Sequence, residues 1–282
     1  MEETQPTHND DYGFETKKAE NWHNKQRTLL TCSRGILATE SQLMKNLSVL
    51  LPHSKKDSKL EKDEIKEQLL ELCETRDCKN VLFFETRGKQ LYLWLCRYPD
   101  GPSIYYQVNN VVAAEDHKLL GNCLKASRAF LSFDDNFNKS AHLSLQKAML
   151  VDAFNLPKNH PKAQPFFDKT FSFNYNAIDD TVYFRNYQIN KNGSKVTDVE
   201  LIEVGPRFDL QIIKAFDGFM GGKVIYMNQG YASPKEIKRK VRQEARKQQF
   251  EKESKKKLKE ITKEEMKHVR KDSYDKYIED SE

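Results

Sequence analysis

The sequence GPRFDLQIIKAF, residues 205–216, sets the plan of the fold because a Gly-Pro step leads directly into an alternating β-prone run. Glycine permits a bend, while proline fixes φ near −65° and removes a backbone donor, so the step predicts the start of a strand. The sequence GPSIYYQV, residues 101–108, has the same form, and its glycine lies 104 residues before Gly205. Arg27 and Arg128 each open another β-prone run and lie 101 residues apart. The spacing predicts a duplicated unit, although a chance likeness of two α+β halves is an alternative interpretation.

The predicted order within each half is strand, helix and antiparallel strands, so the fold class is α+β with two pseudo-repeats at about 27–115 and 128–218. In the first half we expect strands at 27–33, 81–86, 90–97 and 103–108, helices around 43–51 and from 65, and a charged loop at 51–64. In the second half we expect strands at 128–134, 169–175, 181–189, 198–204 and 207–216, a helix at 141–154, and a hairpin around 191–195.

The regions outside the repeats have a different character. Residues 1–26 form a polar arm, and the glycine-bearing residues 219–234 are expected to form a strap lying on the domain. Ser233-Pro234-Lys235-Glu236 is a helix-start pattern, which predicts a helix over 235–271 before an acidic tail at 272–282. The apolar residues of that helix are too sparse to hold it against a core along its length, so it is expected to project.

The charge of the chain is concentrated at its C-terminal end. Residues 235–271 hold 16 Lys and Arg against seven Asp and Glu, a net charge of +9, whereas residues 1–234 hold 30 of each sign. A neutral body with a basic tail predicts a polyanionic partner. No apolar run is long enough for a membrane span, and five scattered cysteines indicate a reducing compartment.

Three features were weighed as sites of chemistry. Gly222-Lys223 lacks the Ser or Thr and the earlier glycine of a phosphate-binding loop. Asp134-Asp135 and Asp179-Asp180 adjoin turn-like sequence, where carboxylates usually bond nearby backbone groups rather than metals. We therefore predict no catalytic residue, no metal site and no cofactor.

The candidate RNA-binding residues are cations in the two halves and at the start of the basic helix. Arg27, Arg128 and Arg207 open predicted strands, where a structural role is equally compatible with the sequence, and Arg185 lies among aromatic residues. The segment 235–247 has nine charged residues, of which only two are acidic, so a solvated charged helix explains it poorly. The full set comprises Arg27, Arg34, Arg128, Arg185, Arg207, Lys235, Lys238, Arg239, Lys240, Arg242, Arg246 and Lys247.

The chain resembles the Brix-domain family over about residues 27–240. The resemblance is carried by RTLLTCSR (27–34), VLFFET (81–86), LYLW (91–94), GNCLKAS (121–127), FRNYQI (184–189), VGPRF (204–208), FDGFMGG (216–222) and YASP (231–234). It implies a duplicated α+β domain similar to the anticodon-binding fold. It also implies a ribosome biogenesis factor of the nucleus and nucleolus that binds pre-rRNA in early large-subunit (60S) precursors, with a companion similar to the EBNA-binding-protein type of assembly factor.

Two other function classes remain open at this point. One is a protein-interaction scaffold of pre-ribosomes without direct RNA binding, in which the basic tail acts as an import signal. The other is a subunit of an RNA-processing enzyme, for which a catalytic constellation would be needed.

Overall fold

The computed structural model describes residues 26–61, 63–116, 127–157, 160, 164–191 and 199–279. The chain divides into two units, Met1–Gln229 and Gly230–Glu282, and each is described by itself. The polar arm up to residue 25, most of the 121–127 motif, the hairpin residues 192–195 and the last three residues of the acidic tail lie outside the described residues.

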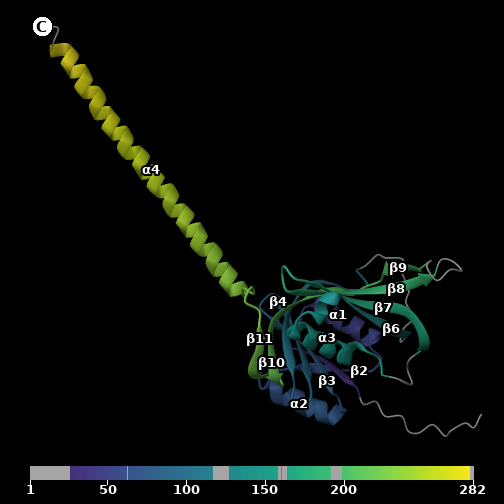
Figure 1. The fold of residues 1–282 in the computed structure, drawn as a ribbon. Helices are drawn as coiled ribbons and strands as arrows, with labels where there is room; N and C mark the ends of the chain where they lie inside the picture. The colour runs from purple at the N-terminus through teal and green to yellow at the C-terminus, as the bar shows by residue number, and fades with distance from the viewer. Residues whose placement is uncertain are drawn as a thin grey trace, which may run out of the picture. The chain divides into compact units, whose positions relative to one another are not determined.

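The first unit contains two runs of helices and strands in the predicted order (Figure 1). The elements of its first half are β1 (Thr28–Ser33), α1 (Ala38–Leu50), β2 (Ser54–Leu60), α2 (Ile65–Arg76), β3 (Asn80–Arg87), β4 (Gln90–Arg97) and β5 (Ser103–Val112). The elements of its second half are β6 (Ser127–Phe133), the 3₁₀ helix η1 (Asp135–Asn138), α3 (Ala141–Phe154), β7 (Gln164–Asn176), β8 (Thr181–Lys191), β9 (Val199–Glu203), β10 (Arg207–Gly218) and β11 (Gly221–Met227).

All of these strands belong to one sheet, whose order is β2-β1-β3-β4-β5-β10-β8-β7-β6. β1 runs parallel to β3 and β6 runs parallel to β7, with a helix in each connection. Antiparallel pairing then leads inward from both sides to β5 and β10, which pair with each other. The duplicated strand–helix–antiparallel-strand arrangement is confirmed, and its two halves meet at β5 and β10.

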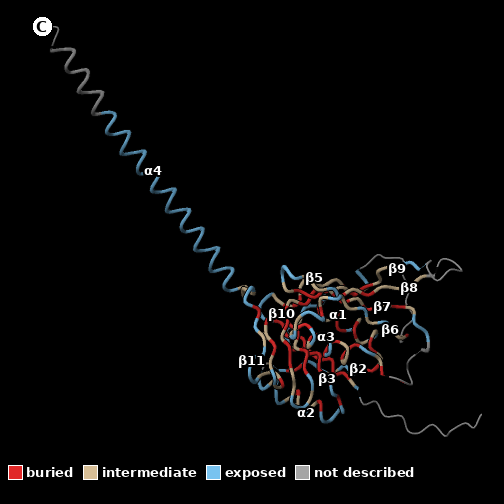
Figure 2. The backbone as a smooth tube through the Cα atoms, in the orientation of Figure 1, coloured by how far each residue is buried: buried red, intermediate tan, exposed pale blue. Residues whose placement is uncertain are grey.

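One face of the sheet buries the main core, and the sequence alternation decides which side chains enter it. In β5, Ile104, Tyr106 and Val108 are buried, while Tyr105 and Gln107 between them are half-exposed. α1 and α3 contribute leucines to this same core, so the helices of both halves share it. α2 packs on a second, smaller core around Leu69 and Cys73 (Figure 2).

Polar side chains of the first half bond the C-terminal end of α3. The hydroxyl of Thr28 and Nε2 of His53 both donate to the carbonyl of Ala153, at 3.2 and 2.9 Å, and Asn80 Nδ2 donates to the carbonyl of Asp152 at 2.8 Å. The last carbonyls of a helix have no partner within the helix, so these bonds satisfy groups that burial would otherwise leave unpaired. They bind the second half to the first.

The prediction of a loop over residues 51–64 is wrong for Ser54–Leu60. This segment forms β2, an edge strand parallel to β1. The lysines of β2 point to solvent, and its sequence lacks the alternation of apolar and polar residues that is typical of a strand. β2 therefore depends on its pairing with the fully buried β1.

The segment predicted as a strap contains β11, which pairs antiparallel with β10. The hydroxyl of Tyr226 donates to Asp180 at 2.6 Å, and the hydroxyl of Tyr175 donates to the same carboxylate at 2.8 Å. Tyr226 also stacks on His142 of α3, with ring centroids 4.1 Å apart. These contacts hold β11 against the rest of the first unit.

The second unit is built around one helix, α4 (Pro234–Glu279), of 46 residues. It begins one residue before the predicted start and continues eight residues beyond the predicted end at 271. Nothing in its sequence breaks a helix, and its described side chains from Lys235 to Lys267 are all exposed (Figure 2).

We predict that His53 makes the stability of the first unit fall between pH 6.5 and 4. Burial lowers the pKa of His53 to about 4, and Nδ1 has no hydrogen-bond partner among the described residues. The unfolded chain binds a proton near pH 6.5. The folded state does not bind it until about pH 4, so the stabilisation present above pH 6.5 is lost on acidification. The loss is on the order of 3 kcal/mol.

Urea unfolding at pH 7 and pH 4.5 would measure this loss. His53→Gln keeps an N–H donor for Ala153 but does not titrate, so its stability should fall by less over the same pH interval. Equal losses for the two proteins would show that His53 is not the group responsible.

Candidate nucleic-acid interface

α4 begins with a capping box that places its basic residues in a regular helix from the first turn. The backbone N–H of Ser233 donates to Glu236 Oε2 at 2.9 Å, and the backbone N–H of Glu236 donates to Ser233 Oγ at 3.3 Å. These bonds, with the positive charges of Arg239 and Lys240, lower the pKa of Glu236. The predicted capping pattern is therefore confirmed in its bonding, and the helix begins at Pro234, one residue before the predicted start.

Five of the seven cations in residues 235–247 occupy one face of α4. Lys238, Arg239, Arg242 and Arg246 follow Lys235 at three, four, seven and eleven residues, which is the spacing of a single helix face. At 1.5 Å per residue this basic face extends for about 16 Å. Lys240 and Lys247 lie away from it, and Ile237 and Val241 form a narrow apolar strip on the opposite side of the helix, 50% and 58% exposed.

The cations of residues 235–247 are free of ion pairs with the described part of the chain. All seven are exposed, and their charge exceeds that of Glu236 and Glu244 by five. A row of exposed, uncompensated cations on a rigid backbone attracts phosphates and releases their counterions on binding. This surface has the chemistry of a polyanion contact.

Four of the five arginines predicted in the two halves, all but Arg128, have carboxylate partners instead. Arg27 Nη1 lies 3.6 Å from Asp77 Oδ2, and Arg34 Nη1 lies 2.9 Å from Glu61 Oε1. Arg207 Nε lies 3.0 Å from Glu203 Oε1. The side chain of Arg128 is half-buried, and its Nε makes no hydrogen bond with a described residue.

Arg185 is the most enclosed of these side chains. Its Nη1 donates to Asp209 Oδ1 at 2.8 Å and to the carbonyls of Phe184 and Phe208 at 2.7 and 3.2 Å. The side chains of Arg185 and Asp209 are only 19% and 3% exposed. Arg185 therefore joins β8 to β10, and its guanidinium is largely occupied by protein groups.

Two surfaces were missed by sequence reasoning. β2 presents Lys55, Lys56 and Lys59 to solvent along the edge of the sheet, and the run SKKDSKL was the available signal. The half-exposed rings of Trp94 and Tyr105 lie 4.4 Å apart on the face opposite the main core. The pairing of these rings depends on the register of β4 and β5, which no short motif reveals.

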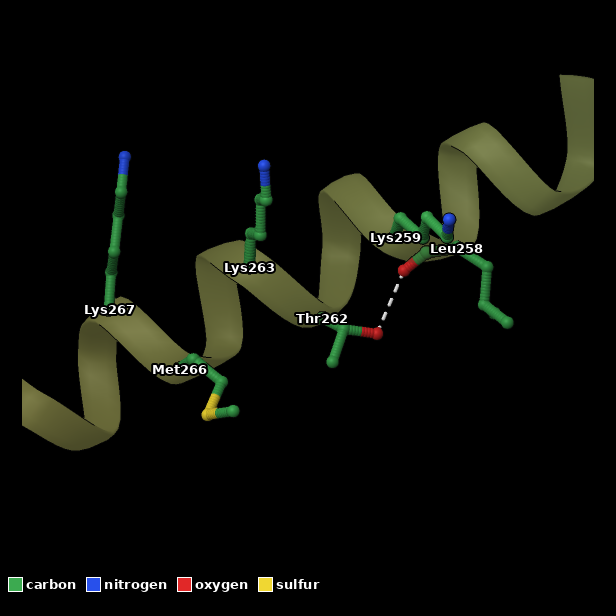
Figure 3. Close-up of a pocket in the computed structure, with 6 residues that line it drawn as sticks. All are labelled: Leu258, Lys259, Thr262, Lys263, Met266 and Lys267. Carbon is green, nitrogen blue, oxygen red and sulfur yellow. Dashed lines mark hydrogen bonds between the residues drawn. The ribbon is translucent and has the colours of Figure 1, made fainter.

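Neither of two hollows among the described residues brings together the groups of a catalytic site. One, of about 360 Å³, is lined by Cys73 and Cys78, whose thiol pKa values burial raises to about 12 and about 11, so both thiols stay protonated at neutral pH. Another is a shallow hollow along α4 lined by Leu258, Lys259, Thr262, Lys263, Met266 and Lys267 (Figure 3). A single helix supplies all of its wall, so it is an open surface and not an enclosed site.

The acidic pairs have structural partners. Asp134 accepts a hydrogen bond from Asn136 Nδ2, and Asp180 accepts from Tyr175 and Tyr226. Within the described ranges no group of three His, Cys, Asp or Glu side chains is placed to hold a metal ion. Over the same ranges no helix is long and apolar enough to cross a membrane.

Comparison with known proteins identifies the family of this chain. The model of the Brix domain matches residues 33–214, which span both halves of the sheet. The chain belongs to the Brix domain family. Curated relatives include "Ribosome biogenesis protein BRX1" of Saccharomyces cerevisiae, 42% identical over 230 residues that make up 79% of this chain and 78% of the yeast protein.

Animal relatives carry the name "Ribosome biogenesis protein BRX1 homolog". The Homo sapiens protein is 41% identical over 222 residues, and the Caenorhabditis elegans protein is 43% identical over 227 residues. These matches cover 78% and 80% of this chain but 61% and 63% of the relatives. The chain thus spans about three fifths of the length of its animal relatives.

We predict that Arg185 supports folding and that Arg242 does not. Arg185→Met should lower the free energy of unfolding by about 3–5 kcal/mol, because it leaves the Asp209 carboxylate buried without its cation. Arg242→Met removes an exposed, unpaired cation and should change it by less than about 0.5 kcal/mol. Urea unfolding of both variants measures the difference, and an Arg185→Met protein as stable as the parent would contradict the assignment.

Proposed function

We propose that this chain is a non-catalytic ribosome biogenesis factor that binds pre-rRNA in early precursors of the large (60S) ribosomal subunit. The names of its Brix-domain relatives support the role in ribosome biogenesis. Direct RNA binding is supported by one observation above all, the exposed and unpaired cations of residues 235–247 on α4. Work on pre-rRNA implies a nuclear and nucleolar location.

In the proposed mechanism the two units have different tasks. The first unit supplies a rigid surface for folded RNA and protein partners. α4 then follows phosphates with the face that carries Lys235, Lys238, Arg239, Arg242 and Arg246. Recognition rests on backbone and shape, since the deep groove of A-form RNA hides base edges from side chains.

The arginines of the first unit are assigned to the structure in this proposal. Arg27, Arg34, Arg185 and Arg207 have carboxylates within 4 Å, which offset the charge that a phosphate would meet. Arg128 remains a candidate contact because no described carboxylate pairs with it. A companion assembly factor of the EBNA-binding-protein type is part of the proposal and rests on the family resemblance alone.

A protein-interaction scaffold without direct RNA binding is the second candidate. The observation that favours it is the neutral first unit, in which the charges of the candidate arginines are largely offset. In that case α4 would not contribute to RNA affinity.

We predict that replacing Lys238, Arg239, Lys240 and Arg242 together with Gln weakens RNA binding and flattens its salt dependence. Lys238, Arg239 and Arg242 lie on the basic face and Lys240 lies away from it, so if each of the three neutralises one phosphate the slope of log K against log salt should fall by about 2 to 3. The measurement is a salt titration of the full chain with a structured transcript of large-subunit pre-rRNA.

A matched control removes four charges elsewhere on α4, with Lys252, Lys259, Lys263 and Lys267 replaced by Gln. This variant should keep most of the parent slope. Equal slopes for the parent and the 238–242 variant would favour the scaffold.

A further inference from the structure

The C-terminal part of α4 carries a lysine row that the RNA proposal does not use. Lys255, Lys259, Lys263 and Lys267 recur at intervals of four residues, and the sequence continues the row at Lys271. Figure 3 shows Lys263 and Lys267 extending from the same side of the helix. The four described side chains are exposed and make no ion pair with a described residue.

The charge of this row is only partly balanced within the helix, where Glu260 and Glu264 lie three residues before Lys263 and Lys267. Residues four apart on a helix are neighbours, so each successive pair of lysines repels. The nearby pair Lys256–Glu260, 3.9 Å apart, shows the opposite arrangement, in which an acid four residues on attracts the lysine. A negatively charged surface lying along the row would relieve the repulsion.

An apolar row runs beside the lysines. Leu258, Thr262 and Met266 each precede a lysine by one position, and Figure 3 shows them on the other side of the ribbon. Leu258 and Met266 are 66% and 60% exposed. The hydroxyl of Thr262 donates to the carbonyl of Leu258 at 2.8 Å, so this polar group is already satisfied within the helix.

The charge balance distinguishes a protein from a nucleic acid as the occupant. Residues 258–267 hold three lysines and three glutamates, so their net charge is zero, whereas residues 235–247 have a net charge of +5. A neutral segment attracts a polyanion only weakly. Exposed apolar side chains with lysines along one side instead complement a surface that is both apolar and acidic.

We propose that Leu258, Thr262 and Met266, flanked by Lys259, Lys263 and Lys267, form a docking face for an acidic amphipathic helix of a partner protein. The partner helix would pack apolar side chains at spacings of three and four residues over this row and place Asp or Glu against the lysines. α4 would then bind RNA through residues 235–247 and protein through residues 258–267.

The test uses the full chain and a synthetic 28-residue helical peptide with Leu at heptad positions a and d and Glu at e and g. A second peptide has Lys in place of every Glu. Changing Lys259, Lys263 and Lys267 to Glu should weaken binding of the Glu peptide at least tenfold and create binding of the Lys peptide. RNA affinity should stay within about twofold of the parent.

The control makes the same charge change in the basic face, with Lys238, Arg242 and Arg246 changed to Glu. This control should lose RNA binding and still bind the Glu peptide. The two assays therefore distinguish a failure of the RNA proposal from a failure of the proposed docking face. The proposal is overturned if both variants bind the Glu peptide equally weakly. It is also overturned if the variant with Glu at 259, 263 and 267 does not lose binding of the Glu peptide and gain binding of the Lys peptide.

A photo-crosslinking residue placed at Met266 tests the same face in cells. The expected product is a protein adduct whose crosslinked peptide carries acidic residues at helical spacing. An RNA adduct at this position, or a crosslinked peptide without acidic residues, would overturn the proposal.

Discussion

The antiparallel pairing of β5 with β10 is the constraint on which the rest of the first unit depends. It joins the strands β1–β5 of the first half to the strands β6–β11 of the second half in one sheet, and it lets α1 and α3 share a single core. The entry to β5 is tight, because a Cβ on Gly101 would lie 2.6 Å from the carbonyl oxygen of Asp217 at the end of β10. Ser103 Oγ adds a bond of 2.6 Å to the carbonyl of Gly218. Only glycine, which also adopts φ of +99° here, permits this approach.

The division of charge follows from the division of the chain. In the first unit, packing brings arginines against carboxylates, as in the enclosed Arg185–Asp209 pair. α4 has no core of its own along its described side chains, so its cations stay in water, and those of residues 235–247 have no carboxylate of the described chain in an ion pair with them. Folding thus offsets much of the charge in one unit and leaves it available in the other. This contrast is the physical basis for assigning RNA contact to α4.

Much of the fold could be predicted from local pattern. The Gly-Pro steps mark the entries to β5 and β10, and Ser233-Pro234 marks the start of α4, because each pattern acts through its own backbone. β2 could not be predicted, since its pairing with β1 is non-local and its lysine-rich sequence has little strand propensity. The roles of the arginines were equally inaccessible. Arg185 finds its carboxylate 24 residues away on another strand, a proximity that only the sheet register creates. The cations of residues 235–247 were predictable because exposure on a helix needs no partner.

The central claim is that RNA contacts come from the basic face of α4 and not from the sheet. Ultraviolet crosslinking of the tagged protein in cells, with both the RNA and the attached peptides sequenced, tests it most directly. The reads should concentrate in large-subunit pre-rRNA, and the attached nucleotides should lie on peptides from residues 235–247. Crosslinks that map instead to β2 or to the strands carrying Arg185 and Arg207, with none on α4, would contradict it.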